Sequence, residues 1–79
     1  MNITVLGAGA WGTALAKLLY ETGHRLTLWS NLASQLTEIQ EHGRNALLPG
    51  IELPRELRVE SDLSRAVAAA ELVVVAWTF

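Results

Sequence analysis

Three glycines, Gly7, Gly9 and Gly12, have the spacing of a phosphate-binding turn. They form the pattern G-x-G-x-x-G, in which the first glycine permits a tight turn, the second lets a ligand approach the backbone, and the third lets a helix pack closely. At the start of such a helix, unpaired N–H groups and the positive end of the helix dipole favour an anion. The pattern therefore predicts a site for the pyrophosphate of a dinucleotide.

The residues on either side of the glycines decide how much weight the pattern carries. Asn2–Leu6 is a short β-prone run, and from Trp11 onward apolar residues recur at helical spacing until Gly23, which is typical of a helix end. The apolar face predicted for this helix consists of Trp11, Ala14, Leu15, Leu18 and Leu19. Because the pattern lies between a strand and a helix, dinucleotide binding is favoured over the alternative, in which the glycines only form a compact turn.

Strand and helix continue to alternate along the rest of the chain. Arg25–Trp29 is predicted to be a strand, and the apolar spacing that follows predicts a helix that ends near Gly43. Residues 44–56 have no period and contain two prolines, which predicts an ordered loop. The remaining elements predicted are a strand at residues 57–60, a short helix at 63–70 capped by Ser61 or Asp62, and a buried parallel strand at 72–76.

This alternation is typical of a parallel sheet covered by helices. We expect an α/β fold, with a Rossmann-type parallel sheet of about four strands, helices on both faces and the strand order 3-2-1-4. A chain of 79 residues with 51 % apolar and 18 % charged side chains is not a disordered tail. We therefore interpret residues 1–79 as the N-terminal part of a dinucleotide-binding Rossmann domain, truncated after the fourth strand.

The charge and composition exclude several classes of partner. The net charge is −2 and no basic cluster is present, which argues against nucleic acid and anionic membrane surfaces. Without cysteine the chain has neither a disulfide nor a cysteine-based zinc site. The apolar run at residues 66–77 contains Glu71 and is too short to cross a bilayer, and the N-terminus lacks the charged start of a secretory signal. We therefore expect no membrane insertion and a cytoplasmic location.

The end of the second predicted strand bears on which dinucleotide is favoured. In many such sites an acidic residue about 20 positions after the glycines binds the adenosine ribose. This chain instead has Trp29, Ser30 and Asn31, so neutral hydroxyl and amide groups would face the ribose. Because no carboxylate would repel a 2′-phosphate, the site is expected to accept NADP or NAD, with a slight preference for NADP. No arginine lies within two residues of this position, although Arg44 could swing in from the following loop toward a 2′-phosphate.

The remaining candidate residues are expected to be mainly structural. Trp11, two positions after the second glycine, is expected to serve both the core and the pyrophosphate site. Lys17 is expected on a solvated helix face, and His24 in a turn at the opposite end of the sheet. His42 lies near a helix end, where a cation favours the dipole. Because no paired carboxylates and no nucleophile–base pair are visible, we expect neither a catalytic residue nor a metal ligand in the chain.

Beyond the glycines, the sequence resembles that of a known family. The segment ITVLGAGAWGTALA, residues 3–16, is similar to the N-terminus of bacterial-type NAD(P)-dependent glycerol-3-phosphate dehydrogenases. Their Gly-(Ala/Ser)-Trp-Gly-Thr-Ala signature is far more specific than the glycines alone, and the resemblance extends over nearly the whole chain. Its further matches are Gly23-His24, Leu28-Trp29, Leu48-Pro49-Gly50-Ile51, Leu53-Pro54, Asp62-Leu63, Ala66 and the final valine-rich strand.

The resemblance implies an oxidoreductase that interconverts dihydroxyacetone phosphate and sn-glycerol 3-phosphate by hydride transfer with NADPH or NADH, and so supplies phospholipid biosynthesis. It also implies an N-terminal NAD(P)-binding Rossmann domain and a C-terminal helical substrate domain that carries the catalytic lysine. By match of motif, the residues from Gly9 to Gly12 would contact the cofactor phosphates, and Ser30 and Asn31 would face the ribose. The cofactor-binding residues expected here are Gly7, Gly9, Ala10, Trp11, Gly12, Ser30 and Asn31.

The sequence also departs from the family pattern. Leu47 stands where the family commonly has an aromatic residue, and the final Ala-Trp-Thr-Phe, residues 76–79, replaces a Val-Pro turn beneath the nicotinamide. The rest of the Rossmann domain and the helical substrate domain are absent, so we expect a fragment of such a dehydrogenase. Two alternatives stay open: a standalone nucleotide-binding or interaction module that associates through an exposed sheet edge, and the Rossmann half of a related dehydrogenase with another substrate.

Overall fold

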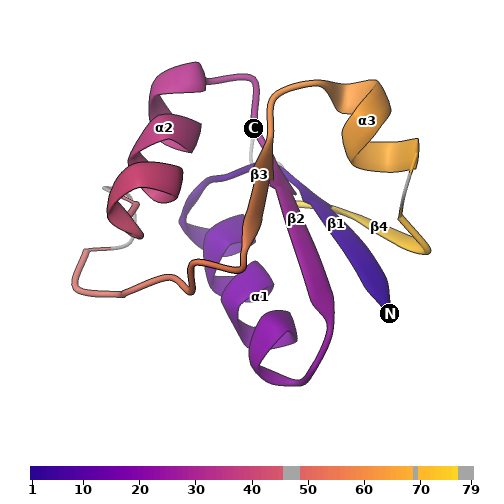
Figure 1. Ribbon diagram of the computed structural model, residues 1–79, viewed down its shortest axis with the longest axis horizontal. Helices are drawn as coiled ribbons and strands as arrows, with labels where there is room; N and C mark the ends of the chain where they lie inside the picture. Colours follow the sequence, from indigo (N-terminus) through magenta and orange to yellow (C-terminus); the bar gives the residue numbers. More distant parts are fainter. Residues whose placement is uncertain (46–48, 69, 77–79) are drawn as a thin grey trace.

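A computed structural model describes residues 1–45, 49–68 and 70–76 of the chain. Strands and helices alternate along it as the sequence predicts (Figure 1). The elements are β1 (Asn2–Leu6), α1 (Ala10–Glu21), β2 (Arg25–Trp29), α2 (Ala33–His42), β3 (Arg58–Glu60), α3 (Leu63–Ala68) and β4 (Leu72–Val75). The expectations for Leu47 and for residues 77–79 lie outside the described residues.

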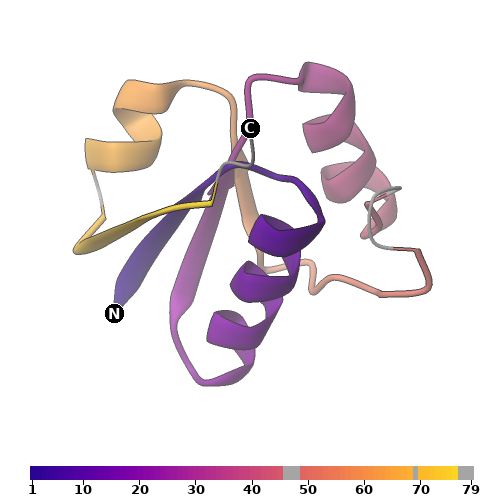
Figure 2. The ribbon, with the colours of Figure 1, turned by 180° about the vertical axis from the view of Figure 1, so that it is seen from behind.

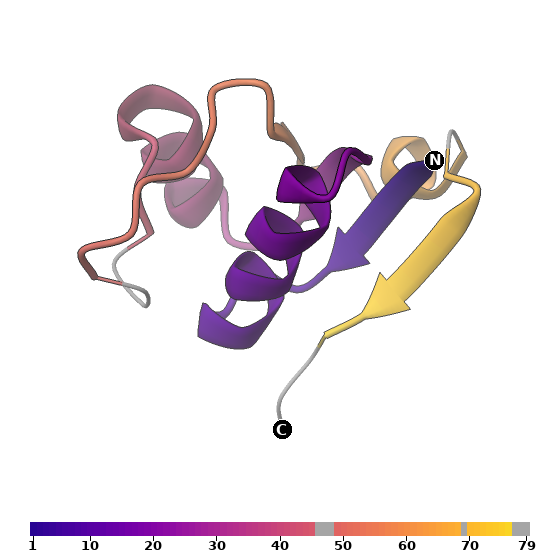
Figure 3. The same cartoon turned by 90° about the horizontal axis from the view of Figure 1, so that it is seen from below.

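The four strands form one parallel sheet with the order β3-β2-β1-β4, which confirms the predicted fold and strand order. The chain crosses from β1 to β2 and then to β3 in one direction, and returns to β4 on the other side of β1. Because parallel crossovers are right-handed, this reversal places α3 on the opposite face of the sheet from α1 and α2 (Figures 1 and 3). The reversal point lies between β1 and β4, next to the turn that contains the glycines.

The hydrophobic core lies between the sheet and helices α1 and α2. Val5 on β1 and Leu28 on β2 are paired in register and are completely buried. The loop at residues 44–56 is ordered over its described part, as predicted, because Leu53 is buried and its N–H group donates to the Gly43 carbonyl oxygen at 2.7 Å. Leu57, at the entrance to β3, joins the same core. The loop therefore completes the core.

The predicted apolar face of α1 is wrong in its orientation. Trp11 and Leu18 are 60 % and 57 % exposed, whereas the residues buried against the sheet are Gly12, Thr13 and Ala16. Because the small residues allow the helix axis to lie close to the strands, the helix is turned so that Trp11 and Leu18 point outward. Only the C-terminal turn packs larger side chains, those of Leu19 and Tyr20, against the core.

Strand β4 is also more exposed than predicted. It was expected to be a buried strand, but Leu72, Val73 and Val75 are 47 %, 36 % and 63 % exposed. The physical reason is its place in the sheet, because β4 pairs with β1 along one edge and is the last strand in the order (Figure 2). The expected exposed sheet edge is therefore present, and it is apolar.

The polar residues before α2 and α3 differ in how they cap these helices. Asp62 accepts a hydrogen bond from the Arg65 N–H group at 3.1 Å, which agrees with its predicted capping role. Before α2 the N-cap is Leu32, and no side chain caps the helix. The Ser30 hydroxyl instead accepts a hydrogen bond from the Leu32 N–H group at 3.1 Å, one step before the helix.

Replacing Leu28 with alanine should lower the free energy of unfolding by about 2–5 kcal/mol, because the side chain is completely buried in a central strand. Leu18→Ala is the matched control, since that side chain is 57 % exposed on α1 and its removal should change stability by less than ~0.5 kcal/mol. Urea unfolding followed by circular dichroism measures both. Equal losses for the two variants would contradict the observed packing.

Candidate nucleotide-binding site

The glycine turn joins the carboxyl end of β1 to the start of α1. Gly7 has φ 115°, a backbone conformation that residues with a side chain rarely adopt. Its N–H group donates to the Trp29 carbonyl oxygen at 2.8 Å, which ties the turn to the end of β2. The first glycine therefore permits the sharp turn that the sequence predicts for it.

Gly12 sets the distance between α1 and the turn. A Cβ atom at this position would lie 1.9 Å from the carbonyl oxygen of Gly7 and 3.1 Å from its carbonyl carbon. Both are backbone atoms, so the clash could not be relieved by a side chain moving aside. The close packing predicted for the third glycine is therefore confirmed, and its contact partner is the first glycine of the pattern.

The N-terminus of α1 is open. Gly9 is the N-cap, no side chain caps the helix, and the first turn has no acidic residue. The first N–H groups of a helix have no acceptor within it, and they carry its partial positive charge. Apart from its chain neighbours, no atom of the described residues lies within 4 Å of a Cβ atom placed at Gly9, so this part of the structure leaves the space next to its backbone open. These features are those of an anion site that can receive a phosphate group directly on the backbone.

The carbonyl group of Ala8, inside the glycine turn, accepts three hydrogen bonds from side chains. The donors are Gln35 Nε2 at 2.5 Å, Asn45 Nδ2 at 2.8 Å and the Thr13 hydroxyl at 3.3 Å. Asn45 Nδ2 also donates to Thr13 Oγ1 at 2.8 Å. The polar side chains of α1, α2 and the following loop thus converge on one backbone atom.

Sequence reasoning missed Gln35 and Asn45. Asn45 is 3 % exposed, yet it lies in a segment without periodicity, so no pattern marks it as a buried position. Gln35 directly precedes the buried Leu36 and therefore borders the core face of α2, which is the one signal that could have drawn attention to it. Their common partner lies 27 and 37 residues earlier in the chain, a separation that local patterns do not report.

Ser30 and Asn31 follow β2 at the same edge of the sheet as the glycine turn, because Leu6 and Trp29 are partners in register. Ser30 is 4 % exposed, and its hydroxyl donates to Gln35 Oε1 at 2.9 Å while it accepts from the Leu32 N–H group. One lone pair of the hydroxyl remains for a ligand. Asn31 is exposed. The structure therefore brings both residues next to the turn, with Asn31 the more accessible.

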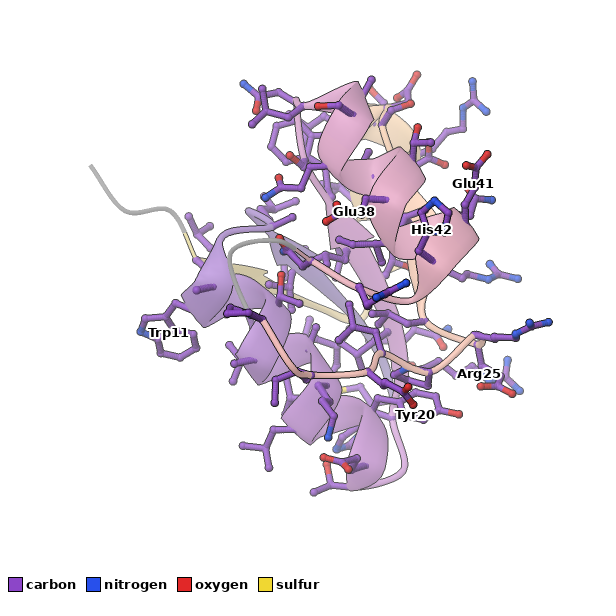
Figure 4. The ribbon with its side chains drawn as sticks, turned by 90° about the vertical axis from the view of Figure 1, so that its left-hand side faces the viewer. Trp11, Tyr20, Arg25, Glu38, Glu41 and His42 are labelled. Carbon is purple, nitrogen blue, oxygen red and sulfur yellow. The ribbon has the colours of Figure 1, made fainter. Side chains whose placement is uncertain are left out.

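Trp11 lies on the first turn of α1 and projects away from the body of the molecule (Figure 4). At 60 % exposure it is not a core residue, so the expectation that it serves the core is wrong. The reason is its neighbour Gly12, whose contact with Gly7 turns the preceding residue outward. Trp11 is consequently available to a ligand at the start of the helix.

The other candidate residues lie away from this site. Lys17 pairs with Glu21 at 3.1 Å on α1, as expected for a solvated helix face. His24 is half-buried at the amino end of the strands, where its Nδ1 atom has no hydrogen-bond partner among the described residues. Tyr20 donates to Glu56 at 3.2 Å, and this hydrogen bond to a carboxylate raises the pKa of the Tyr20 hydroxyl above its ordinary value.

A groove runs along β3 and the C-terminal half of α2. Its lining includes His24, Arg25 and Tyr20 but none of the residues of the glycine turn. Figure 4 shows Arg25 and Tyr20 well apart from Trp11. Arg25 begins β2, His24 directly precedes it and Tyr20 is in the last turn of α1, so these residues lie at the amino ends of the strands, whereas ligands of open parallel sheets bind outside the carboxyl ends. The groove is therefore separate from the candidate site.

The parallel sheet, the turn Gly7 to Gly12 and the uncapped helix together define a Rossmann-type nucleotide-binding domain. A family profile described as the NAD-dependent glycerol-3-phosphate dehydrogenase N-terminus matches residues 2–78. The chain belongs to this family. The resemblance seen in the sequence is thereby confirmed.

Individual relatives agree with this assignment. The chain is 50 % identical over 76 residues to a glycerol-3-phosphate dehydrogenase [NAD(P)+] of Geobacillus thermodenitrificans, with 95 % of the chain and 22 % of the relative covered. It is 47 % identical over 77 residues to the enzyme of the same name from Anaeromyxobacter sp. (strain K), with 96 % and 23 % covered. The chain thus spans less than a quarter of the length of these relatives.

Solved structures show the same fold. A crystal structure of glycerol-3-phosphate dehydrogenase from Coxiella burnetii superposes with a TM-score of 0.85 at 35 % identity, covering 94 % of this chain and 23 % of that one. The Plasmodium falciparum glycerol-3-phosphate dehydrogenase, at 22 % identity, has a TM-score of 0.81 over 95 % of this chain and 24 % of its own, and supports the fold alone. In the part of the chain that the structure describes, no helix has the length and apolar character needed to cross a membrane.

Gly12→Ala should lower the free energy of unfolding by about 1–3 kcal/mol, because the added methyl group would press against the Gly7 backbone. Gly9→Ala is the matched control within the same turn. Its φ is −69° and its surroundings are open, so stability should change by less than ~0.5 kcal/mol. Thermal and urea unfolding measure both variants, and a Gly12→Ala variant as stable as the unaltered chain would refute the close contact.

Proposed function

We propose that the chain binds NADP or NAD as the N-terminal part, residues 1–79, of the NAD(P)-binding Rossmann domain of a glycerol-3-phosphate dehydrogenase. The observation that carries this proposal is the open start of α1, where, among residues 1–45, 49–68 and 70–76, no side chain caps Gly9 and no atom beyond its chain neighbours lies within 4 Å of its Cβ position. A pyrophosphate placed there would receive hydrogen bonds from the helix N–H groups. The family to which the chain belongs is described as NAD-dependent, which agrees with this ligand.

Each residue of the turn has its own part in this binding. The proposed contacts with the phosphates are backbone contacts of Gly9, Ala10, Trp11 and Gly12, since the first N–H groups of the helix are free of internal acceptors. Gly7 supplies the turn that directs them outward. The exposed indole of Trp11 would lie beside the bound pyrophosphate.

The adenosine ribose would lie at the end of β2. Asn31 offers an exposed amide, and Ser30 offers the remaining lone pair of its hydroxyl. Neither is an acid, so a 2′-hydroxyl and a 2′-phosphate are both tolerated. This neutrality supports the inference that both NADP and NAD bind.

The reaction proposed for the whole protein is hydride transfer between dihydroxyacetone phosphate and sn-glycerol 3-phosphate. Its support is the name shared by the relatives, glycerol-3-phosphate dehydrogenase [NAD(P)+]. The resemblance implies a catalytic lysine and a helical substrate domain, which we place in the part of the relatives that this chain does not span. The cytoplasmic location and the supply of phospholipid biosynthesis are part of the same proposal.

A second candidate function is association through β4. In the part of the chain that the structure describes, one edge of this strand pairs with no other strand, and its residues Leu72, Val73 and Val75 are exposed. An apolar edge strand pairs readily with another strand. This observation favours a module that also assembles through its sheet. Sedimentation of the purified chain tests for this association. A monodisperse monomer would contradict assembly through β4.

Titration of the purified chain with NADPH and NADH should give saturable changes in tryptophan fluorescence, since Trp11 is exposed at the proposed phosphate site. Gly9→Ala should weaken both nucleotides by about tenfold or more, which corresponds to ~1.4 kcal/mol, because its methyl group would occupy the space of the phosphate. Circular dichroism confirms that the variant is folded. A folded chain that responds to neither nucleotide would overturn the proposal.

Asn31→Asp should separate the two nucleotides. A carboxylate at the end of β2 repels a 2′-phosphate and accepts a hydrogen bond from a 2′-hydroxyl, so NADPH should bind about tenfold more weakly relative to NADH. The measurement is the ratio of the two dissociation constants, with Asn2→Asp at the opposite end of the sheet as control. If the ratio of the NADPH and NADH dissociation constants were unchanged in Asn31→Asp, the proposed position of the adenosine ribose next to Asn31 would be wrong.

A further inference from the structure

We propose that Gln35 and Asn45 are positioning residues, which hold the Ala8 carbonyl inward and thereby aim the Gly9 N–H group outward at the phosphate. The inference rests on the proposed function, because it concerns the same site. It assigns to two side chains from outside the glycine pattern the task of orienting one peptide unit within that pattern.

The orientation follows from the geometry of the peptide bond. The unit that joins Ala8 to Gly9 is planar and trans, so its C=O and N–H groups point in opposite directions. Three donors from Gln35, Asn45 and Thr13 hold the oxygen at 2.5, 2.8 and 3.3 Å on the protein side. The Gly9 N–H group must then point to the other side, where no side chain caps the helix.

The peptide unit between Ala8 and Gly9 is also the one in the turn that other contacts restrain least. Gly9 has no side chain and its Cβ position is open, so little else restricts rotation of the unit. Rotation by half a turn would point the Ala8 carbonyl oxygen at the phosphate, and two partial negative charges would then face each other. The three hydrogen bonds oppose that rotation before any ligand arrives.

Burial strengthens the hold. Ala8 is 2 % exposed, Thr13 is completely buried and Asn45 is 3 % exposed, so water has little access to replace these hydrogen bonds. A rotated peptide would leave the Asn45 amide with one acceptor fewer in a buried position, which is unfavourable. The inward orientation of the carbonyl is therefore the stable one.

The network also links the two parts of the proposed site. Ser30 donates to Gln35 Oε1 at 2.9 Å, which turns the Nε2 end of the amide toward Ala8. Ser30 lies at the end of β2, where the ribose is proposed to bind, and Ala8 lies in the phosphate turn. Gln35 thus connects the residue proposed to lie beside the adenosine ribose to the backbone proposed to bind the pyrophosphate.

Gln35→Ala provides the first test, with Gln40→Ala as the matched control. Both residues lie on α2, and Gln40 is exposed, so each substitution removes one amide from the same helix without disturbing its formation. In the full chain, Gln35→Ala should weaken NADH by about tenfold, equivalent to ~1.4 kcal/mol, while Gln40→Ala should leave its affinity unchanged. Without nucleotide, the NMR signals of the Ala8 carbonyl carbon and the Gly9 amide should shift only in Gln35→Ala.

Asn45→Ala provides the second test, with Thr4→Val as a control for lost stability. Thr4 is 2 % exposed, and its hydroxyl donates at 2.6 Å to the carbonyl oxygen of Ala66 on α3, on the opposite face of the sheet from α1 and the Ala8 network. Both variants lose a buried polar side chain. Only Asn45→Ala should shift the Ala8 and Gly9 signals and weaken NADH.

The outcomes separate this inference from the proposed function. Affinities and NMR signals that are unchanged in both Gln35→Ala and Asn45→Ala would overturn the positioning role, as would an equal loss of affinity in Thr4→Val. If the unaltered chain bound neither NADH nor NADPH, the proposed function would fail. The shifts of Ala8 and Gly9 in the absence of nucleotide would still test the hold on the turn, and unchanged shifts would overturn it.

Discussion

The contact between Gly12 and the carbonyl group of Gly7 determines the arrangement of the rest of the site. Because a Cβ atom at Gly12 would lie 1.9 Å from the Gly7 oxygen, helix α1 can approach the turn only with a glycine at this position. This approach places Thr13 and Ala16 against the sheet and leaves Trp11 exposed. It also brings the start of the helix to the carboxyl end of β1, where its N–H groups are open to a ligand.

The alternating strands and helices of this structure could be predicted from the sequence. The strands, the helices, the strand order and the roles of Gly7 and Gly12 follow from short-range spacing. The buried face of α1 could not be predicted. The spacing of its large apolar residues indicated that Trp11 and Leu18 face the core, whereas in the structure the small residues Gly12, Thr13 and Ala16 pack against the sheet. Asn45 and the exposure of β4 depend on contacts between distant segments, which no local pattern reports.

In the proposed site, backbone groups bind the phosphates and side chains orient that backbone. The proposed phosphate contacts are made by the backbone of α1, whereas Gln35, Asn45 and Thr13 act on the Ala8 carbonyl behind it. This division explains how a chain without a charged residue in the turn can be organised for an anion. It also fits the share of the relatives that the chain spans, 22 %, which contains the glycine turn and the following βα units.

An NMR titration of the isotopically labelled chain with NADH tests the central claim most directly, namely that the start of α1 binds the dinucleotide phosphates. The account predicts that the amide signals of Gly9, Ala10 and Gly12 shift in proportion to saturation, while those of Arg25 and Tyr20 in the separate groove stay in place. Shifts confined to the groove, with the signals of the turn unchanged, would contradict it.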